Sequence, residues 1–526
     1  MLRRRMKTRL AGQAGFALPA VLIGMMLAGA FTVAALDAAS GDVPAARKDQ
    51  DHKRAFDAAQ AGIAWYRFQL TRDPNYWTNC DNVPAVAPGV PAPVNQRWNR
   101  VGADPRRWRT LPGVTDASYT LELIPATGQA ACSTATPQTS MLQDNTLRIR
   151  STGLVRGKKR AIVATFKRHS FLDYIYYSTY ETSDPVTYGP GPDGAAANTS
   201  TGCARYKRTG RNTFTYGGNT YTCNEIQFTS GDTVAGPLHT NDQLLTCGTP
   251  TFGRAGDRIE TSDPTLSRVS GCGGTPNIVG TPYPASPTLT MPPSNGTLKA
   301  LADPTYRFTG KTTLEFNGAS VLATNNGVTK TLPLPPPNGV IYVSSGACGQ
   351  AYQIYQNYDA PDGCGNALVK GTYSAGVTVG SDNDIIINGS LTRNGDAMMG
   401  LIANNFVRVY HPVDYSTSGC PNVPLTGTAA MPNPLVIDSA ILSVNHSFIV
   451  DNYFCGTPKG TLRVNGAIAQ VFRGPVGTGS GTTSVSGYLK SYNYDDRFAY
   501  KEPPNFIDPI QSEWRMVRAT ESQPAK

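Results

Sequence analysis

Residues 12–36 read GQAGFALPAVLIGMMLAGAFTVAAL, and this stretch decides how the rest of the chain is placed. No charged residue occurs between Phe16 and Leu36. A helix of about 20 apolar residues spans the roughly 30 Å hydrocarbon core of a membrane. Asp37 follows the run, and five cations precede it: Arg3, Arg4, Arg5, Lys7 and Arg9. The positive-inside rule therefore predicts a single-pass anchor with a cytoplasmic N-terminus and an external ectodomain.

The bond between Gly15 and Phe16 carries a further indication. A short basic leader that ends in Gly and is followed by Phe and an apolar run resembles the class III leader of type IV pilin-like proteins. The resemblance implies that a prepilin peptidase cuts after Gly15 and that an N-methylated Phe16 begins the mature chain. An ordinary secretory signal cut after Val33-Ala34-Ala35 is the rival, although such signals have an apolar core of about 7–15 residues. A plain N-terminal anchor is a third reading with the same topology.

Ala20 departs from the pilin pattern. Major pilins of this family carry a Glu at the fifth mature position, where it pairs with the N-terminal amine of a neighbouring subunit. A buried charge is costly without its partner. A subunit with Ala20 has no such charge to pair, which suits a minor pilin at a tip or in an initiating complex. The other reading is that Ala20 is simply an anchor residue.

A second helical pattern runs from Ala45 to Leu70. One face of it is apolar at spacings of three and four: Phe56, Ala59, Ile63, Tyr66 and Leu70. The segment 56–62 resembles the Ala-rich stretch after the membrane helix of PilX-type minor pilins. Gly41 and Pro44 predict a kink or break before this segment.

Composition favours short strands and turns in the remainder. The 526 residues include 53 Gly and 40 Pro, and charged residues make up 16% against about 25% in an average protein. Residues 71–169 are predicted to form a small α+β region. Within it, Leu147 to Phe166 alternates as a hairpin with a turn at Gly157. This helix followed by antiparallel strands is how a pilin head is built.

The predicted hairpin is strongly basic. Eight Lys and Arg residues and no acid lie between Arg148 and Arg168. A basic surface could extend to four further cations: Arg205, Lys207, Arg208 and Arg211. Nucleic-acid binding would need interleaved aromatics and several phosphate contacts. We therefore prefer a solvated hairpin face and expect no nucleic-acid partner.

Residues 170–504 repeat one design of strand, Asn-Gly corner and small residue. It occurs as LEFNGA at 314–319, IIINGS at 385–390 and LRVNGA at 462–467. Asn and Gly tolerate positive φ at sharp corners. We expect a right-handed parallel β-solenoid, in which strands stack into a continuous core. An antiparallel β-sandwich, with Asn-Gly as hairpin turns, is the alternative.

This region also resembles a family of uncharacterised bacterial surface proteins. The likeness lies in GPLHTN at 236–241, GLIA at 400–403, RGPVG at 473–477 and YLKSYNYDDR at 488–497. That family often carries a pilin-like N-terminus and implies no activity. The predicted organisation is a leader at 1–15, a membrane helix at 16–36, a helix extension at 37–70, the α+β region, the β-solenoid and a polar tail at 505–526. Trp514 is the one residue of that tail with a reason to dock back.

The ten cysteines are even in number and contain no Cys-x-x-Cys pair. After an export signal, disulfides are the natural reading. Pairing neighbours in order is the simplest arrangement: Cys80–Cys132, Cys203–Cys223, Cys247–Cys272, Cys348–Cys364 and Cys420–Cys455. Free buried thiols are the alternative.

The chain offers little catalytic chemistry. The five histidines are not spaced as a metal pair, and His239 is expected to anchor a corner by hydrogen bonds. A calcium or sugar site could be formed by Asp382, Asp384 and Asp396, or by Asp495 and Asp496 beside Arg497. The second group could equally form an internal ion pair. We expect no catalytic residue, no metal and no cofactor.

The sequence therefore predicts a minor pilin-like surface subunit rather than an enzyme. Its partners would be other pilin subunits, the pilus assembly machinery, the prepilin peptidase, the inner membrane and a surface ligand. It would act in a type IV pilus or pseudopilus, at the tip and in adhesion. The alternative is an exported β-solenoid hydrolase or lyase of a polysaccharide, which would need acids converging on one groove.

Overall fold

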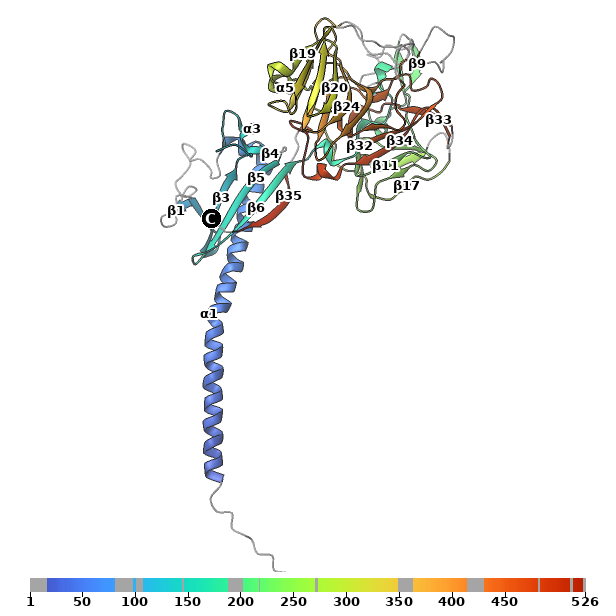
Figure 1. Ribbon diagram of the computed structural model, residues 1–526. Coiled ribbons are helices and arrows are strands. Elements are labelled where there is room, and N and C mark those ends of the chain that lie inside the picture. The colour runs from blue at the N-terminus through green and yellow to red at the C-terminus, as the bar shows by residue number, and fades with distance from the viewer. Residues whose placement is uncertain are drawn as a thin grey trace, which may run out of the picture.

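The chain forms a long helix, a small head and a larger β-rich domain (Figure 1). The computed structural model describes residues 17–80, 98–100, 107–143, 146–187, 202–216, 218–269, 273–348, 363–413, 430–480, 483–510 and 514–523. Most of the regular structure is β, with one long helix, as the sequence predicts. The predicted leader and the Gly15–Phe16 bond lie outside the described residues.

Helix α1 (Ala17–Arg72) is continuous through Gly41 and Pro44. Of the predicted kink or break, the continuous helix excludes the break, because Ala-rich sequence on both sides favours the helix. Of the five residues predicted on one apolar face, four are buried and Phe56 is half-buried. Among the residues that the structure describes, no helix is both long enough and apolar enough to cross a membrane.

The head consists of the C-terminal part of α1 and a seven-stranded antiparallel sheet in the order β1-β2-β3-β5-β6-β35, with β4 paired to β5. The strands are β1 (Trp98–Arg100), β2 (Arg107–Leu111), β3 (Val114–Ile124), β4 (Leu142–Gln143), β5 (Thr146–Val155), β6 (Lys158–Arg168) and β35 (Trp514–Ser522). The predicted hairpin is β5–β6. Its two turn residues, Arg156 and Gly157, both have positive φ, as a type I′ turn requires.

Helix α1 packs closely on this sheet. A Cβ on Gly153 of β5 would lie 1.9 Å from the carbonyl oxygen of Ala55, so only glycine lets the helix approach there. The head core includes Ile63, Tyr66 and Phe166. The short helices η1 (Tyr76–Asn79) and α3 (Pro137–Met141) lie beyond the end of α1 and are tied by the Cys80–Cys132 disulfide.

The end of the chain completes the head instead of forming a polar tail. Strand β35 pairs antiparallel with β6, with Trp514 opposite Arg168 and Ser522 opposite Ala161. Trp514 is buried in the head core. The β-rich domain, here called the β-domain (residues 170–510), is therefore inserted between two neighbouring strands of one sheet.

The β-domain is built from parallel ladders. The first ladder runs, in spatial order, through β19 (Arg307–Thr309), β23 (Val340–Ser344), β25 (Val377–Ser381), β27 (Met399–Ala403), β30 (Ala440–Ser443), β32 (Pro458–Phe472), β7 (Tyr176–Tyr180), β12 (Leu238–Thr240), β15 (Arg258–Thr261) and β18 (Thr281–Tyr283).

The second ladder contains β20 (Thr312–Gly318), β24 (Ala367–Tyr373), β26 (Ile385–Arg393), β28 (Val407–Val409), β29 (Leu435–Ile437), β31 (Phe448–Val450), β32, β34 (Thr483–Tyr494), β11 (Thr233–Ala235), β14 (Thr251–Phe252) and β17 (Asn277–Ile278). A short third ladder joins β10 (Phe228–Thr229), β13 (Leu244–Cys247) and β16 (Ser267–Val269). A core of buried Val, Ile, Leu and Phe contains residues from all three ladders.

Apart from an isolated bridge between Thr290 and Ile510, antiparallel pairing within the described part of this domain is local. The local pairs join β20 to β21 (Ser320–Asn325), β21 to β22 (Val328–Pro333), β33 (Gly477–Ser480) to β34, and β8 (Thr213–Tyr216) to β9 (Asn219–Thr222). The remaining short helices are η2 (Phe171–Asp173), η3 (Pro185–Thr187), η4 (Lys207–Thr209), α5 (Gly296–Leu301), η5 (Pro304–Tyr306) and η6 (Asp496–Ala499). The long ladders are thus parallel, unlike those of the alternative antiparallel sandwich.

The first strand of the β-domain lies in the middle of its ladder. Strand β7 pairs with β12 on one side and with β32 on the other, although β32 comes almost 300 residues later in the chain. One run of strands leads away from β7 to β18, and a second run returns from β19 to β32. We call the β32–β7 contact the seam, because both ends of the β-domain meet there.

The three Asn-Gly segments adopt three different structures. Gly318, with φ of +60°, begins the hairpin turn between β20 and β21. Asn388 and Gly389 lie within β26, where its register against β24 shifts. Asn465 and Gly466 lie within β32, where this strand passes from the second ladder to the first. One segment is therefore a hairpin turn, and another is a corner.

Candidate functional site

An apolar hollow of about 510 Å³ lies in the head between α1 and β35. We call it the head groove. Its lining is mostly apolar: Phe56, Ile63, Ala64, Phe68, Ile162, Met516 and Ala519, with Gln60, Arg67, Thr71, Thr520 and Glu521. Phe68 and Met516, which line the head groove, are 57% and 42% exposed.

Arg160, near the turn of the basic hairpin, contacts two residues that line the head groove. Arg160 donates from Nε to Glu521 Oε1 at 2.5 Å, and its guanidinium lies 4.6 Å from the centre of the Phe56 ring. The hydrogen bond from Arg160 lowers the pKa of Glu521. Lys159 lies 5.7 Å from the centre of the Trp108 ring. These two cations therefore contact groups of the head itself.

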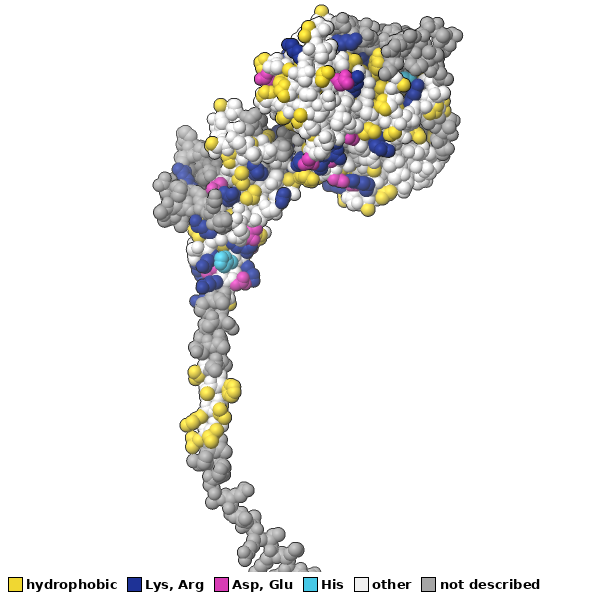
Figure 2. Space-filling view, viewed as in Figure 1, with side chains coloured by type: hydrophobic (Ala, Val, Ile, Leu, Met, Phe, Trp, Pro, Cys, Tyr) yellow, Lys and Arg dark blue, Asp and Glu magenta, His cyan; other side chains and the backbone are white. Residues whose placement is uncertain are grey.

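The same chain carries an uncovered apolar surface on the N-terminal part of α1. Large apolar side chains between residues 21 and 33 are about half or more exposed: Val21, Leu22, Ile23, Met25, Met26, Leu27, Phe31 and Val33. Figure 2 shows them along the free part of the helix, well away from the head. Exposed apolar patches of this size mark protein or membrane contacts.

His239 is a structural residue. It is buried, and its ring nitrogens lie 3.0 Å from Glu260 Oε2 and 3.0 Å from Asn241 Oδ1. Tyr174 also donates to Glu260 at 2.9 Å. Burial raises the pKa of Glu260, but His239, Tyr174 and Arg258 outweigh it and hold that pKa below its ordinary value. This is the anchoring role that the sequence predicts for His239.

The three aspartates at 382–396 do not converge on one site. Asp382 accepts hydrogen bonds from Tyr342 and from the Ser345 amide. Asp384 is buried against Arg408, which also pairs with Asp451 at 2.9 Å. Asp396 lies on the surface, where Lys501 and Arg497 lower its pKa to about 2. Among the described residues, no group of His, Cys, Asp and Glu could hold a metal ion.

Asp495 and Arg497 form an internal ion pair, one of the two readings of that segment, whereas Asp496 pairs elsewhere. Arg497 pairs with Asp495 at 2.6 Å and with Asp396 at 3.0 Å. Asp496 pairs with Arg254 at 2.7 Å. Each carboxylate is thus occupied by a cation of this chain.

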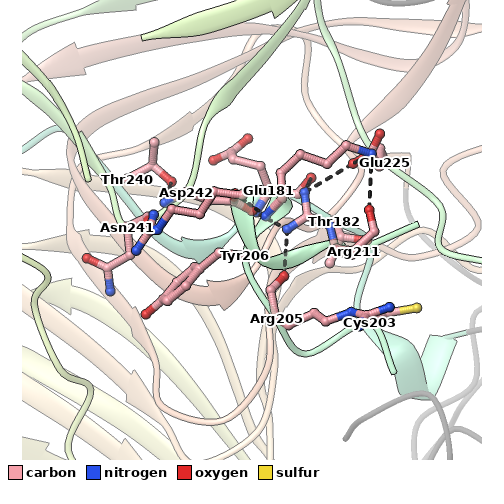
Figure 3. A network of polar contacts seen from close by, with 12 residues as sticks. Glu181, Thr182, Cys203, Arg205, Tyr206, Arg211, Glu225, Thr240, Asn241 and Asp242 are labelled. Atoms are coloured by element: carbon pink, nitrogen blue, oxygen red, sulfur yellow. Dashed lines mark hydrogen bonds and ion pairs between the residues drawn. The ribbon is translucent and has the colours of Figure 1, made fainter. Parts of the chain in front are cut away.

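The sequence suggested that Arg211 could belong to a basic surface. In the structure, Arg211 is instead buried beside the seam. Its guanidinium donates to the Asp242 carboxylate, to Glu225 Oε1 at 3.2 Å and to the Arg205 carbonyl oxygen at 2.8 Å (Figure 3). Asp242 also accepts from the Glu181 amide at 3.0 Å and the Lys207 amide at 2.8 Å. The network therefore joins the β7 end, the 203–225 segment and the β12 end.

Arg473 extends this network across the seam. It donates to Glu181 Oε2 at 3.0 Å and to the carbonyl oxygens of Ile226 and Gln227 at 3.0 Å and 3.1 Å. Its guanidinium carbon lies 3.5 Å from the centre of the Phe228 ring. Every charge here has a partner, so the network is suited to holding the fold together rather than to binding a substrate.

Three of the five expected disulfides are present: Cys80–Cys132, Cys203–Cys223 and Cys348–Cys364. Cys247 and Cys455 are also disulfide-bonded. Their expected partners, Cys272 and Cys420, lie outside the described residues.

Sequence reasoning missed the head groove and the seam. Trp514 and Met516, two residues apart, gave the only indication that residues 514–522 form a strand. The residues next to Met516 in the sequence did not indicate that it would lie beside α1. Met516 and α1 are more than 400 residues apart in the chain.

No protein-family model and no curated protein matches the chain. Among solved structures, it is similar to the crystal structure of the competence-associated pilin ComZ from Thermus thermophilus. The two are 11% identical, with 90% of this chain and 97% of that chain covered and a TM-score of 0.27. A TM-score this low does not establish a common fold.

Proposed function

We propose that the protein is a minor pilin-like surface subunit that takes part in type IV pilus or pseudopilus assembly. The observation that carries the proposal is the pair of unfilled apolar surfaces on one chain, the head groove and the α1 segment 21–33. An uncharged helix from a neighbouring subunit has the chemistry to fill the groove. A contact between two different surfaces of pilin-like subunits is heterologous, and it builds an open fibre when its rotation does not close into a ring.

Before assembly, the proposal places the apolar segment in the bacterial inner membrane. The uncharged run at 16–36 and the five leader cations support a single pass with the N-terminus in the cytoplasm. Cleavage by a prepilin peptidase between Gly15 and Phe16, followed by N-methylation, would then release the subunit for assembly.

A position at the tip, and a role in adhesion, are part of the same proposal. Ala20 stands where a shaft pilin would carry its pairing Glu. The β-domain lies beyond the head, away from the free N-terminal part of α1, and is larger than the head (Figure 1). Such a bulk would obstruct neighbours in a repeating shaft but not at its end, where it would be displayed to a surface ligand.

We further propose that the parallel ladders are the faces of a right-handed β-solenoid, to each of which successive coils contribute strands. The parallel register of successive strands supports it, as does β32, which pairs in both long ladders and so turns a corner between two faces. Crossovers between parallel strands of one sheet are right-handed in about 98% of cases.

The proposed role is not enzymatic. A polysaccharide hydrolase or lyase needs acids that converge on a groove. Asp382, Asp384 and Asp396 instead lie in separate interactions, which gives no support to that alternative.

N-terminal sequencing of the mature protein from cells with a prepilin peptidase tests the processing step. We expect a chain that begins at Phe16. A chain that begins at Leu36 would identify a secretory signal and contradict the proposal.

Assembly is tested by Phe68→Glu and Met516→Glu in the full-length chain. Each places a charge at the rim of the head groove, so we expect normal membrane levels but less protein in sheared fibres. Val328→Glu, at a site that is 57% exposed in the β-domain, is the matched control. Wild-type incorporation of both groove variants would show that the groove is not an assembly contact.

A further inference from the structure

The β-domain is joined to the head by two connections that lie side by side. The outgoing connection leaves β6 at Arg168 and enters η2 at Phe171 after only two residues. Ser170 caps η2 in a capping box with Asp173. The returning connection leaves η6 and rejoins the sheet at β35, directly beside β6. The outgoing side therefore has no flexible linker.

Lys167 ties the head to the returning connection. This side chain belongs to β6 but is buried at the junction, where its ammonium donates to the Phe498 carbonyl oxygen and lies 2.9 Å from Glu502 Oε1. Burial by itself lowers the pKa of Lys167, but Glu502 and Asp173 outweigh it and raise the net pKa. The lysine is therefore a cation held between the two domains.

Arg515 makes the opposite tie. It belongs to β35, the strand to which the returning connection leads, yet it pairs with Asp173 of the outgoing connection. Asp173 also accepts from the Ser170 amide at 3.2 Å and lies 3.1 Å from His169 Nδ1. Each head strand thus holds the connection of the other strand, and we call Lys167, Asp173, Glu502 and Arg515 the crossed clamp.

Apolar packing reinforces the crossed clamp on both sides. Phe171, Leu172, Phe498 and Phe506, which belong to the two connections, are buried in one cluster of the β-domain core. The Tyr494 hydroxyl donates to the Leu172 carbonyl oxygen at 2.8 Å. On the head side, Trp514 Nε1 donates to the Pro74 carbonyl oxygen at 2.7 Å, beyond the end of α1.

We infer that the crossed clamp holds the head and the β-domain as one rigid unit, so that a pull on the β-domain is passed to the head sheet and α1 instead of opening a hinge. A pull on the β-domain would act on β6 and β35 together and in the same direction, because these antiparallel neighbours both meet the β-domain at the same end of the sheet. The load then falls on the β5–β6 ladder and on the packing of α1. This coupling goes beyond fibre assembly, because it holds whether or not the chain enters a fibre.

Distance measurements on spin-labelled full-length protein in detergent test the inference. One label replaces Val114 in the head and the other replaces Val328 in the β-domain, both exposed. Non-canonical amino acids carry the labels, so the native disulfides are left unchanged. We expect one narrow distance distribution in the wild type. Its width should at least double in the Lys167→Met/Arg515→Met variant, because each connection then loses its tie to the other strand.

Controls separate hinge opening from unfolding. A second label pair within the β-domain, at Val328 and Val485, should stay narrow in every variant. Lys370→Met, which removes a surface pair with Glu315 at 3.3 Å, should leave both distributions unchanged. If the distance distributions of both label pairs broaden in the double variant, the single variant Arg515→Met is used as the test of the inference. Arg515 is 36% exposed, so its substitution disturbs the fold less than that of the buried Lys167. A broad wild-type distribution, or clamp variants as narrow as the wild type, would overturn the inference.

Discussion

Arg473 illustrates how single residues hold the β-domain together. It comes from the end of the second run of strands, and its partner Glu181 comes from the beginning of the first. Both side chains are buried, and Glu181 also accepts from Tyr176 at 2.9 Å. Buried ion pairs add little net stability over apolar packing, but removal of one partner leaves an uncompensated charge.

Arg473→Met should therefore destabilise the β-domain by about 3–5 kcal/mol. Denaturant unfolding measures the free energy. Lys370→Met, at an exposed pair, should cost only about 0–1 kcal/mol. Equal losses of unfolding free energy in the two variants would show that the Arg473–Glu181 pair contributes no more to stability than an exposed ion pair.

His446 predicts a pH dependence. It lies 3.0 Å from Asp184 Oδ2 and stacks on Phe406. Burial lowers its pKa, but Asp184 and Asp384 outweigh burial, and the net pKa lies above the ordinary 6.5. Because the folded state binds this proton more tightly, the stabilisation is complete below pH 6.5 and is lost as pH rises through the folded pKa.

The free energy of unfolding, measured from pH 5.5 to 8.5, should fall more steeply with pH in the wild type than in His446→Gln. The slope and not the absolute stability is compared, because the substitution also removes the ring stack. Parallel curves would mean that His446 has the same pKa in both states.

At the scale of elements, the contact between α1 and β5 determines the shape of the head. Its closest point is Gly153, and Gly62 on α1 is similarly placed, with the Tyr119 ring 2.8 Å from a Cβ built there. The helix can therefore lie directly on the sheet backbone, with Ile63 and Tyr66 in the core.

Gly153→Ala should force α1 away from β5 and destabilise the head by about 1–3 kcal/mol, the usual cost of overpacking. Gly273→Ala is the matched control, because nothing lies within 4 Å of a Cβ at that position. Thermal unfolding of the two variants measures the difference. If Gly153→Ala left the thermal stability of the head unchanged, α1 would be able to shift away from β5 without a loss of stability.

At the scale of the whole molecule, the β-domain is an insertion whose two ends meet. Because β7 lies in the middle of its ladder, the start of this domain is beside β32 and not at a distant end. Trp514 and Arg168 are directly opposite in the head sheet. Both domains consequently keep complete cores of their own.

The head should fold without the β-domain. Replacing residues 169–513 by Asn-Gly would join Arg168 to Trp514 through a two-residue turn of the kind that hairpins favour. We expect cooperative thermal unfolding and an intact Cys80–Cys132 disulfide, checked by circular dichroism and by mass spectrometry. A molten product would show that the head depends on the β-domain. A matched variant that ends at Ile510, and so lacks β35, should fail, because it exposes the β6 edge and removes Trp514.

The sequence by itself determined what depends on neighbouring residues. The apolar face of α1 from Ala59 to Leu70, the β5–β6 hairpin and the mostly β composition all follow from spacings of a few to about twenty residues. Such spacings are set by helix and strand periods and by short loop closure. His239 as a buried anchor was predictable in the same way, from its place between Leu238 and Asn241.

Only the tertiary structure decided what depends on distant partners. The pairing of β35 with β6, the seam between β32 and β7 and the partners of Arg473 and Lys167 join residues hundreds of positions apart. A strand has the same pattern of apolar residues whichever neighbouring strand it pairs with. An Asp or Glu looks the same in the sequence whether or not its carboxylate forms an ion pair. The physical reason is that packing and charge compensation are properties of three-dimensional neighbours, which a local pattern does not encode.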